Sequence, residues 1–392
     1  MLPLNWQRVR LGDIGKPCMC KRVMKHQTTR YGEIPFYKIG TFGNTADAFI
    51  SKKLFLEYKT KYSFPKKGDI LISASGTIGR AVIYDGKPAY FQDSNIVWID
   101  NDETLVKNDF LFYVYSHVKW NTEHTTILRL YNDNFRNTLI PLPPLNEQIA
   151  IANILSDVDR YLYSLDALIL KKESVKKALS FELLSQRKRL KGFNQAWQRV
   201  RLGDICYLKN GFSFKSDLFK NMGIPIIRIS NISSVDNCIN TNDLVFYDPI
   251  LIDNDYILKQ GDLILAMSGA TTGKSCLYNL NKIAYLNQRV GVFRAKTSFC
   301  YDFLVQFVFS ELFTSRLKLI LTAGAQPNIS SFDIEDFEIL LPPLDEQIAI
   351  ANILSGLDSE IISLKNKKRQ FENIKKALNH DLMSAKIRVL KK

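Results

Sequence analysis

The sequence lacks the features that mark membrane, secreted and metal-binding proteins. No apolar run approaches the roughly 18 residues that a membrane span requires, and polar residues interrupt any apolar core after Met1, so a signal peptide is not expected. The six cysteines include no CxxC pair, which favours reduced thiols. Cys18, Cys20 and His26 form a nominal metal-ligand set without a counterpart later in the chain. We expect a cytoplasmic protein with no bound metal.

A recurring catalytic constellation is also missing. The four histidines are dispersed, and no Ser, His and Asp order recurs along the chain. A metal-dependent nuclease could use Glu57 and Lys59 with Asp47, but no Pro-Asp pair precedes them. The Asp/Asn-Pro-Pro-aromatic motif of adenine methyltransferases is absent, because Leu145 and Leu344 follow the Pro-Pro pairs. The chain is therefore expected to bind a target and position it, while another chain supplies catalysis.

A phosphate-binding loop is suggested only superficially by the stretch "SGATTGKS", Ser268 to Ser275. A P-loop needs four residues between its first glycine and the Gly-Lys pair, whereas three separate Gly269 from Gly273. An earlier stretch, "ASGTIGRA", follows the same kind of apolar strand and has no P-loop spacing either. We interpret the pair as a duplicated strand-turn-strand whose turns approach phosphates of a duplex, with simple tight turns as the alternative.

What is present is an internal repeat. "WQRVRLGDI" occurs at 6–14 and again at 197–205 with all nine residues identical. "LPPLNEQIAIANILSDVD" at 142–159 returns at 341–358 with fifteen of eighteen positions unchanged. Between these anchors the two halves diverge strongly. The repeat predicts a shared scaffold that carries two different middle segments.

Each repeat is predicted to end in a long helix. Asn146 and Asp345 are placed as N-caps, and Glu147 and Glu346 fall in the first turn, where the helix dipole favours a negative charge. The first helix is predicted to reach about Lys191, before a glycine.

Both helices carry an apolar stripe with the spacing of a coiled coil. A long helix with one such stripe has nothing to bury it against inside its own domain, so the partner is expected to be the other repeat. A pseudo-twofold relation then makes the helices antiparallel and the pair a spacer between domains. The seam residues are Ile151, Leu155, Val158, Leu162, Leu165, Ile350, Leu354, Leu357, Ile361 and Leu364.

The charge indicates an anionic partner. A formal net charge of +14 and a pI near 9.3 favour nucleic acid, with an acidic protein surface or a merely solvated basic surface as alternatives. Candidate DNA contacts lie on loops and strand ends of the divergent middles, where the residue type changes between repeats while the position persists. They are Lys38, Thr41, Ser75, Thr77, Arg80, Gln92, Asp93, Arg129 and Tyr131 in the first repeat and Arg228, Asn231, Ser268, Thr271, Lys274, Asn287, Gln288, Arg289 and Asn328 in the second.

The chain resembles the specificity subunits of type I restriction-modification systems over essentially its full length. The resemblance rests on "W-x-x-V-x-L-G-D-I", on the "G-D-I/L-L/I-x-x-x-x-S-G" strand-turn and on "L-P-P-L-x-E-Q" before a long helix, each present twice. It implies an α/β (α+β) fold with curved sheets in two target-recognition domains, 1–145 and 193–344. A central conserved helix, 146–192, and a C-terminal one, 345–392, would form the antiparallel coiled coil.

The resemblance also implies a function. Such a subunit reads a bipartite, asymmetric double-stranded DNA sequence and is not itself an enzyme. Two methyltransferase subunits dock along the helices and use S-adenosylmethionine, with a restriction subunit as an optional further partner; no cofactor is expected on this chain. Two alternatives are a DNA enzyme that uses a nucleotide or metal on its own, and a coiled-coil scaffold for proteins only.

Overall fold

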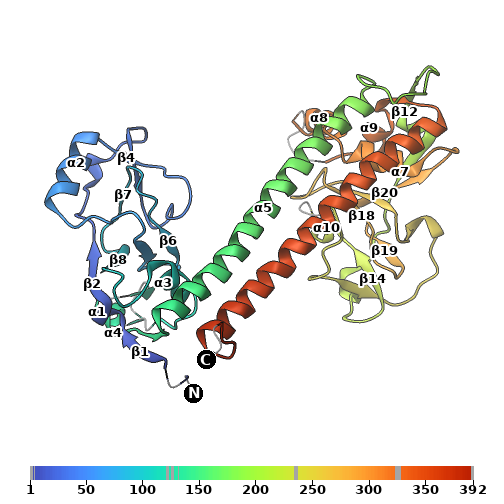
Figure 1. The fold of residues 1–392 in the computed structure, drawn as a ribbon. Coiled ribbons are helices and arrows are strands. Elements are labelled where there is room, and N and C mark those ends of the chain that lie inside the picture. The colour runs from blue at the N-terminus through green and yellow to red at the C-terminus, as the bar shows by residue number, and fades with distance from the viewer. Residues whose placement is uncertain are drawn as a thin grey trace. The chain divides into compact units, whose positions relative to one another are not determined.

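In the computed structural model the chain divides into two units, Met1–Asp166 with Asn366–Lys392 (unit 1) and Ala167–Lys365 (unit 2). Each unit holds a globular domain and parts of two long helices (Figure 1). Among the described residues, no helix combines the length and apolar character that crossing a membrane requires. The structure describes residues 3, 5–120, 123–124, 128–130, 132–233, 237–322 and 328–389.

Unit 1 is built on a four-stranded antiparallel sheet of order β2-β8-β5-β6. A second sheet has the order β4-β3-β7, with β3 and β7 parallel, and β1 pairs with β11. Its strands are β1 (Gln7–Arg10), β2 (Gly15–Met19), β3 (Ile34–Tyr37), β4 (Phe49–Ile50), β5 (Ile70–Ser73), β6 (Ala81–Ile83), β7 (Tyr90–Phe91), β8 (Ile96–Asn101), β9 (Glu123–His124), β10 (Leu128–Arg129) and β11 (Leu139–Leu142). Its helices are α1 (Leu11–Ile14), η1 (Lys25–Gln27), α2 (Lys52–Lys61), α3 (Asn108–Tyr115) and α4 (Asn132–Asn137).

Unit 2 repeats this topology. Its main sheet has the order β13-β20-β17-β18, its second sheet the order β15-β14-β19-β16, and β12 pairs with β21. The strands are β12 (Gln198–Arg201), β13 (Cys206–Asn210), β14 (Ile224–Ile227), β15 (Val245–Tyr247), β16 (Ile257–Leu258), β17 (Leu263–Ala266), β18 (Ser275–Leu277), β19 (Ala284–Leu286), β20 (Val290–Ala295) and β21 (Glu338–Leu341). The helices are α6 (Leu202–Ile205), η2 (Ser216–Leu218), η3 (Ile229–Asn231), η4 (Asn254–Tyr256), α7 (Tyr301–Val308), α8 (Glu311–Thr322) and α9 (Ser331–Glu335).

The central strand of each main sheet is buried on both faces. In β5, Ile70 and Ile72 join Phe110 of α3 in one core, while Leu71 joins Tyr90 of β7 in another. Successive side chains of a strand point to opposite faces, so one strand serves two cores. Strand β17 repeats this pattern, and each main sheet therefore lies between a helical layer and a second sheet.

In unit 1 the first part of α5 (Leu145–Leu184) lies against the last part of α10 (Leu344–Met383). Lys375 Nζ contacts Asp159 at 2.5 Å and Lys368 Nζ contacts Asp166 at 2.6 Å. The residue numbers rise along one helix as they fall along the other, so the two segments are antiparallel. The Tyr161 and Phe371 rings fill the space between them with centroids 4.6 Å apart.

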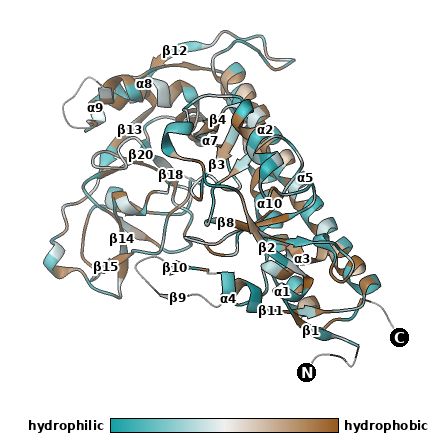
Figure 2. Cartoon of the chain, turned by 90° about the vertical axis from the view of Figure 1, so that its left-hand side faces the viewer, coloured by the Kyte–Doolittle hydropathy of each residue, from teal (hydrophilic) through white to brown (hydrophobic). Residues whose placement is uncertain are grey.

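In unit 2 the last part of α5 and the first part of α10 are antiparallel as well. Lys365 Nζ lies 2.7 Å from Glu173, and Lys172 Nζ lies 2.5 Å from Glu360. Both helices carry hydrophobic and hydrophilic residues along their length (Figure 2). The residues predicted to form the seam are buried or half-buried. Ile151, Leu155, Leu165, Ile350, Leu354 and Ile361 are buried, and Val158, Leu162, Leu357 and Leu364 are half-buried.

Both ends of the predicted first helix are corrected by the structure. Helix α5 begins at Leu145, so Asn146 is its second residue and not the N-cap, and α10 begins at Leu344, one residue before Asp345. The carbonyl of Pro144 accepts hydrogen bonds from the amides of Glu147 and Gln148. The proline is therefore the residue that precedes the first turn of the helix. At the other end α5 stops at Leu184 and not at Lys191.

The early stop has a physical cause. After α5 the chain reverses at Gln186, which has a φ of 62°, and Arg189 returns to contact Glu346. After α10 the chain reverses at Ala385, with a φ of 57°, and Arg388 contacts Glu147. Arg189 and Arg388 therefore each pair with a buried carboxylate at the start of the other long helix.

A Trp–Glu–Arg cluster forms at the start of each long helix. In unit 1, Glu147 is 2% exposed and accepts Trp6 Nε1 at 3.0 Å and Arg388 Nε and Nη2 at 2.7 and 3.0 Å. In unit 2, Glu346 is fully buried and accepts Trp197 Nε1 at 2.9 Å and the two donors of Arg189 at 2.6 and 3.2 Å. A planar guanidinium bonds both carboxylate oxygens, which is the geometry that best compensates burial of the charge.

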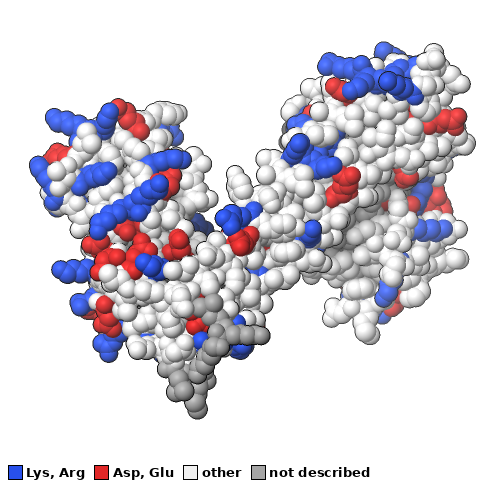
Figure 3. Space-filling view, viewed as in Figure 1, with Lys and Arg blue, Asp and Glu red and all other residues white. Residues whose placement is uncertain are grey.

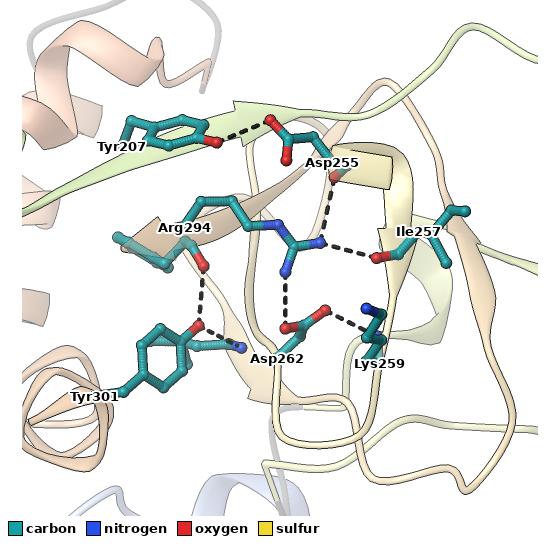
Figure 4. A network of polar contacts seen from close by, with 9 residues as sticks. Tyr207, Asp255, Ile257, Lys259, Asp262, Arg294 and Tyr301 are labelled. Atoms are coloured by element: carbon teal, nitrogen blue, oxygen red, sulfur yellow. Dashed lines mark hydrogen bonds and ion pairs between the residues drawn. The ribbon is translucent and has the colours of Figure 1, made fainter. Parts of the chain in front are cut away.

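A polar network ties the main sheet of unit 2 to the loop before β16 (Figure 4). Arg294 Nη1 donates to Asp262 at 2.8 Å, and Nη2 donates to the carbonyls of Ile257 and Asp255 at 2.9 and 3.3 Å. The hydroxyl of Tyr207 donates to the Asp255 carboxylate at 2.8 Å, and this bond raises the pKa of Tyr207. The network therefore fixes a loop to β13 and β20.

Candidate nucleic-acid interface

The glycine turns connect antiparallel strands and do not have the geometry of a P-loop. In unit 2 the turn joins β17 to β18, and the amides of Thr272, Gly273 and Lys274 donate to carbonyls of the turn and of β17. A P-loop leads into a helix and leaves such amides free for phosphates. Gly269 and Gly273 both have a φ of +83°, a conformation that favours glycine.

Beside this turn unit 2 has a hollow with a volume of about 660 Å³. Four predicted residues meet there, and Arg289 is the charged residue among those that line it. Gln288, Arg289 and Asn328 are exposed, and in the described part of the chain no side-chain hydrogen bond or ion pair engages them. The hollow is lined by Asn210, Met267, Ser268, Gly269, Gln288, Arg289, Asn328, Ile329 and Ser330. It offers donors and acceptors that a base edge or phosphate can use.

The other predicted residues of unit 2 do not line the hollow. Asn231 is buried, and its amide bonds the backbone of Arg228, Asn240 and Asp243. The guanidinium of Arg228 donates to the Asp243 carboxylate and carbonyl at 2.9 and 3.0 Å. These two side chains hold their loop together.

Three further predicted residues of unit 2 flank that loop or the turn. Thr271 Oγ1 donates to the carbonyl of Ile229 at 3.0 Å. Lys274 and Asn287 are half-buried.

In unit 1 the side chains of Ser75 and Arg129 both contact the side chain of Asn95. Ser75 Oγ donates to Asn95 Oδ1 at 2.7 Å, and Arg129 Nη2 lies 3.5 Å from the same oxygen. Ser75 and Arg129 also form a β-bridge. The turn of unit 1 therefore carries its own cluster of polar side chains at the position where unit 2 has its hollow.

The remaining predicted residues of unit 1 are mostly engaged with other protein groups. Thr41 Oγ1 accepts the Lys38 amide at 3.1 Å, and Lys38 Nζ pairs with the exposed Asp47. Arg80 donates to the carbonyl of Phe42 at 2.9 Å.

Two more predicted residues of unit 1 accept hydrogen bonds. Gln92 accepts the Ile39 amide at 3.0 Å, and Asp93 accepts Arg22 Nε at 2.7 Å. Thr77 is exposed on the turn. Tyr131 lies outside the described residues.

Sequence reasoning missed Asn95 and Asn210. Tyr90 of repeat 1 and Tyr285 of repeat 2 occupy equivalent positions, because their strands pair with equivalent partners. Repeat 1 then has one residue more before its next strand, so Asn95 corresponds to Arg289. Counting back from the apolar strands β8 and β20, and not only forward from the tyrosines, would have revealed the insertion.

Basic and acidic side chains are interspersed on the face of the molecule seen in Figure 3. On the face shown in Figure 3, each unit carries lysine and arginine side chains with acidic ones between them. In the described ranges no three His, Cys, Asp or Glu residues are grouped so as to hold a metal ion. Burial raises the pKa of the Cys20 thiol to about 12, so this thiol stays protonated at neutral pH.

Comparison with known proteins gives one consistent result. A family model described as the type I restriction modification DNA specificity domain matches residues 3–172 and again residues 194–373. The chain is 29% identical over 416 residues to the type I restriction enzyme MjaVIII specificity subunit of Methanocaldococcus jannaschii, a match that covers 99% of this chain and 94% of that one. A putative type I restriction enzyme specificity subunit of Haemophilus influenzae is 64% identical over 148 residues, which is 38% of each chain.

The fold is shared with a solved structure. The S subunit of the type I restriction-modification system from M. genitalium aligns with a TM-score of 0.63 at 17% identity, covering 97% of this chain and 98% of that one. The two family matches begin and end close to the two sequence repeats, so each repeat is one copy of the same domain.

Proposed function

The chain belongs to the family of type I restriction-modification DNA specificity subunits, and we propose that each of its units reads one half of a bipartite, asymmetric DNA sequence through the polar side chains around its glycine turn. The observation that carries this proposal is the hollow of unit 2. Ser268, Gln288, Arg289 and Asn328 surround it, and the last three are exposed without partners in the described part of the chain. Apart from the shared serine, the equivalent places in unit 1 carry different side chains on the same backbone frame, as two different half-sites require.

The long helices are proposed to position partner subunits. Leu145 and Ile149 at the start of α5 are 40% and 46% exposed, and Leu344 and Ile348 at the start of α10 are 44% and 42% exposed. The same apolar pair is thus presented once in each unit, which suits two copies of one partner. We propose that these partners are methyltransferase subunits that bind S-adenosylmethionine and carry out catalysis, with a restriction subunit as a further partner.

The paired helices are also proposed to set the spacing between half-sites. A 40-residue helix is about 60 Å long at 1.5 Å per residue. Two such helices in antiparallel register would act together as a spacer of fixed length.

The test is DNA binding and modification by the purified chain with its methyltransferase subunits. Methylated sites in DNA exposed to the complex, read by sequencing, should reveal two unlike half-sites separated by a fixed spacer. Binding to that sequence should weaken steeply as salt rises, because phosphate contacts release counterions. Turnover of ATP, or of DNA with magnesium, by the purified chain alone would instead favour an enzyme. Absence of salt-dependent DNA binding would favour a protein-only scaffold.

A further inference from the structure

Two equivalent positions around the glycine turns carry an arginine and an asparagine in exchanged order. The first position is fixed by a β-bridge, which joins Ser75 to Arg129 in unit 1 and Ser268 to Asn328 in unit 2. Arginine in one unit therefore corresponds to asparagine in the other.

The second position shows the reverse exchange. It is fixed by a hydrogen bond from the residue before the turn, from the Ala74 amide to the Asn95 carbonyl at 2.7 Å and from the Met267 amide to the Arg289 carbonyl at 2.9 Å. We call Asn95 with Arg129, and Arg289 with Asn328, the Arg/Asn pairs.

Both members of a pair flank the same strand end. The residue before the turn is Ala74 in unit 1 and Met267 in unit 2, and its amide donates to the carbonyl at the second position. Its own carbonyl accepts the amide of the residue that follows the first position, which is Leu130 in unit 1 and Ile329 in unit 2. The backbone at the end of the strand thus lies between the backbones of the two positions in each unit, and in unit 1 the side chains of the pair lie within 3.5 Å of each other. A ligand that reaches the turn would meet both members of the pair.

These two side chains are the ones best suited to distinguish purines. Arginine can donate two hydrogen bonds to O6 and N7 of guanine, and asparagine can bond N6 and N7 of adenine. Both turns begin with a serine and a glycine, and these small residues permit close approach of a duplex.

The two pairs differ in how they are held. Arg289 and Asn328 in unit 2 are exposed, and no described residue bonds their side chains. In unit 1 Ser75 holds Asn95 Oδ1 at 2.7 Å, and Arg129 is half-buried beside it. The pair of unit 1 is therefore orientated before a ligand arrives, whereas the pair of unit 2 is free to adjust.

We propose that the Arg/Asn pair is a specificity-determining element of each unit, and that its exchange reverses the order in which a guanine and an adenine are read. This inference rests on the proposed function, because it assumes that the units read DNA. It adds which residues read the bases, and it relates the two half-sites to each other at one place.

The test uses the full chain with its methyltransferase subunits and the double variant Arg289→Asn with Asn328→Arg. The variant gives unit 2 the order found in unit 1. We expect the methylated sequence to change at the two positions of the unit 2 half-site that the pair reads, with guanine and adenine exchanged. The half-site of unit 1 should stay as it is.

A second variant guards against misfolding of the double variant. Arg289→Lys keeps the charge but loses the planar two-pronged donor, and in the described part of the chain the Arg289 side chain has no hydrogen bond or ion pair to lose. It should reduce discrimination for guanine at one position by about 10- to 100-fold. Lys282→Ala, which changes an exposed basic residue that does not line the hollow, is the matched control and should leave the sequence preference unchanged.

The outcomes separate the two proposals. A wild-type complex that recognises no bipartite sequence would overturn the proposed function. A wild-type complex that does, together with Arg289→Lys and double variants that keep its half-site unchanged, would overturn the Arg/Asn inference alone.

Discussion

The two units give different partners to an equivalent aspartate, which is buried in unit 1 and half-buried in unit 2. Asp262 of unit 2 and Asp69 of unit 1 follow the same glycine, and each accepts a backbone amide, at 2.8 and 2.7 Å. In unit 2 Arg294 pairs with this aspartate at 2.8 Å. In unit 1 the residue equivalent to Arg294 is Asp100. The two occupy the same place in the pairing of β8 with β2 and of β20 with β13.

The acidic residue that replaces the arginine in unit 1 finds its own basic partner at the surface. Asp100 pairs with the exposed Lys66 at 2.9 Å, and Asp69 is left buried without an arginine. Burial is the main cause that raises the pKa of Asp69, and the charge of Asp100 adds to it. The Trp–Glu–Arg clusters show no such exchange. An ion pair with an exposed partner can differ between the units, whereas the buried glutamate at the start of each long helix keeps the same kinds of partner in both.

The largest expected effect concerns the clusters themselves. Replacing Glu147 or Glu346 with alanine leaves a largely buried arginine and a tryptophan N–H without their acceptor. We expect each change to lower the free energy of unfolding of its own unit by about 3–5 kcal/mol. Hydrogen exchange measured separately for peptides of each unit checks this.

Matched glutamine variants give the control for that prediction. Glu147→Gln and Glu346→Gln keep an acceptor for tryptophan and remove the charge, so their effects should be smaller than those of alanine. If one unit tolerates alanine while the other does not, the two clusters are not equivalent and the comparison fails.

The second prediction contrasts Arg294 with Asp100. Arg294→Ala leaves Asp262 nearly buried and unpaired, and should destabilise unit 2 by about 3 kcal/mol. Asp100→Ala removes an exposed partner of Lys66 and should change unit 1 by about 0.5 kcal/mol or less. Exchange rates of β17 and β5 peptides report the two effects. Equal losses would show that Lys66 and Arg294 contribute alike, contrary to their exposure.

The smallest expected effect depends on pH and concerns Asp69. Because its pKa is raised in the folded state, the folded state keeps the proton where the unfolded state, with a pKa of about 3.9, has lost it. Stability of unit 1 therefore falls as pH rises through this window.

Asp69→Asn should remove that dependence. We expect the variant to gain stability relative to wild type between pH 4 and pH 7, and Asp100→Asn to give part of the same gain. The measurement is hydrogen exchange of the β5 peptides at several pH values, with rates corrected for intrinsic exchange. A gain that is larger below pH 4 than at pH 7 would contradict the sign.

The scaffold shared by the two units could be predicted from the sequence because the sequence contains two copies of it. Matching positions such as Ile151 and Ile350 revealed the paired helices, and the structure buries both. The end of the first helix could not be predicted, because Arg189 is drawn away by Glu346, 157 residues distant in the sequence. Helix propensity and a following glycine hold no information on such a contact.

The candidate site was predictable by position more than by role. Residues near the turns were found because they follow matched strands, and Ser268, Gln288, Arg289 and Asn328 do line one hollow. Asn231 has a side chain suited to reading a base, yet it bonds backbone within its own loop. Side-chain chemistry alone does not distinguish a group that faces a ligand from one that faces its own chain.

The tryptophan and the glutamate of each Trp–Glu–Arg cluster lie in the stretches that match between the repeats, and the arginine lies outside the divergent middle segments. Tryptophan opens a repeat, glutamate follows its Pro-Pro pair, and arginine comes after the opposite long helix. A genetic crossover within the matched stretches would therefore transfer a whole recognition segment and leave both clusters intact. A new combination of half-sites would then arise in a single recombination event, while the Trp–Glu–Arg clusters stay unchanged.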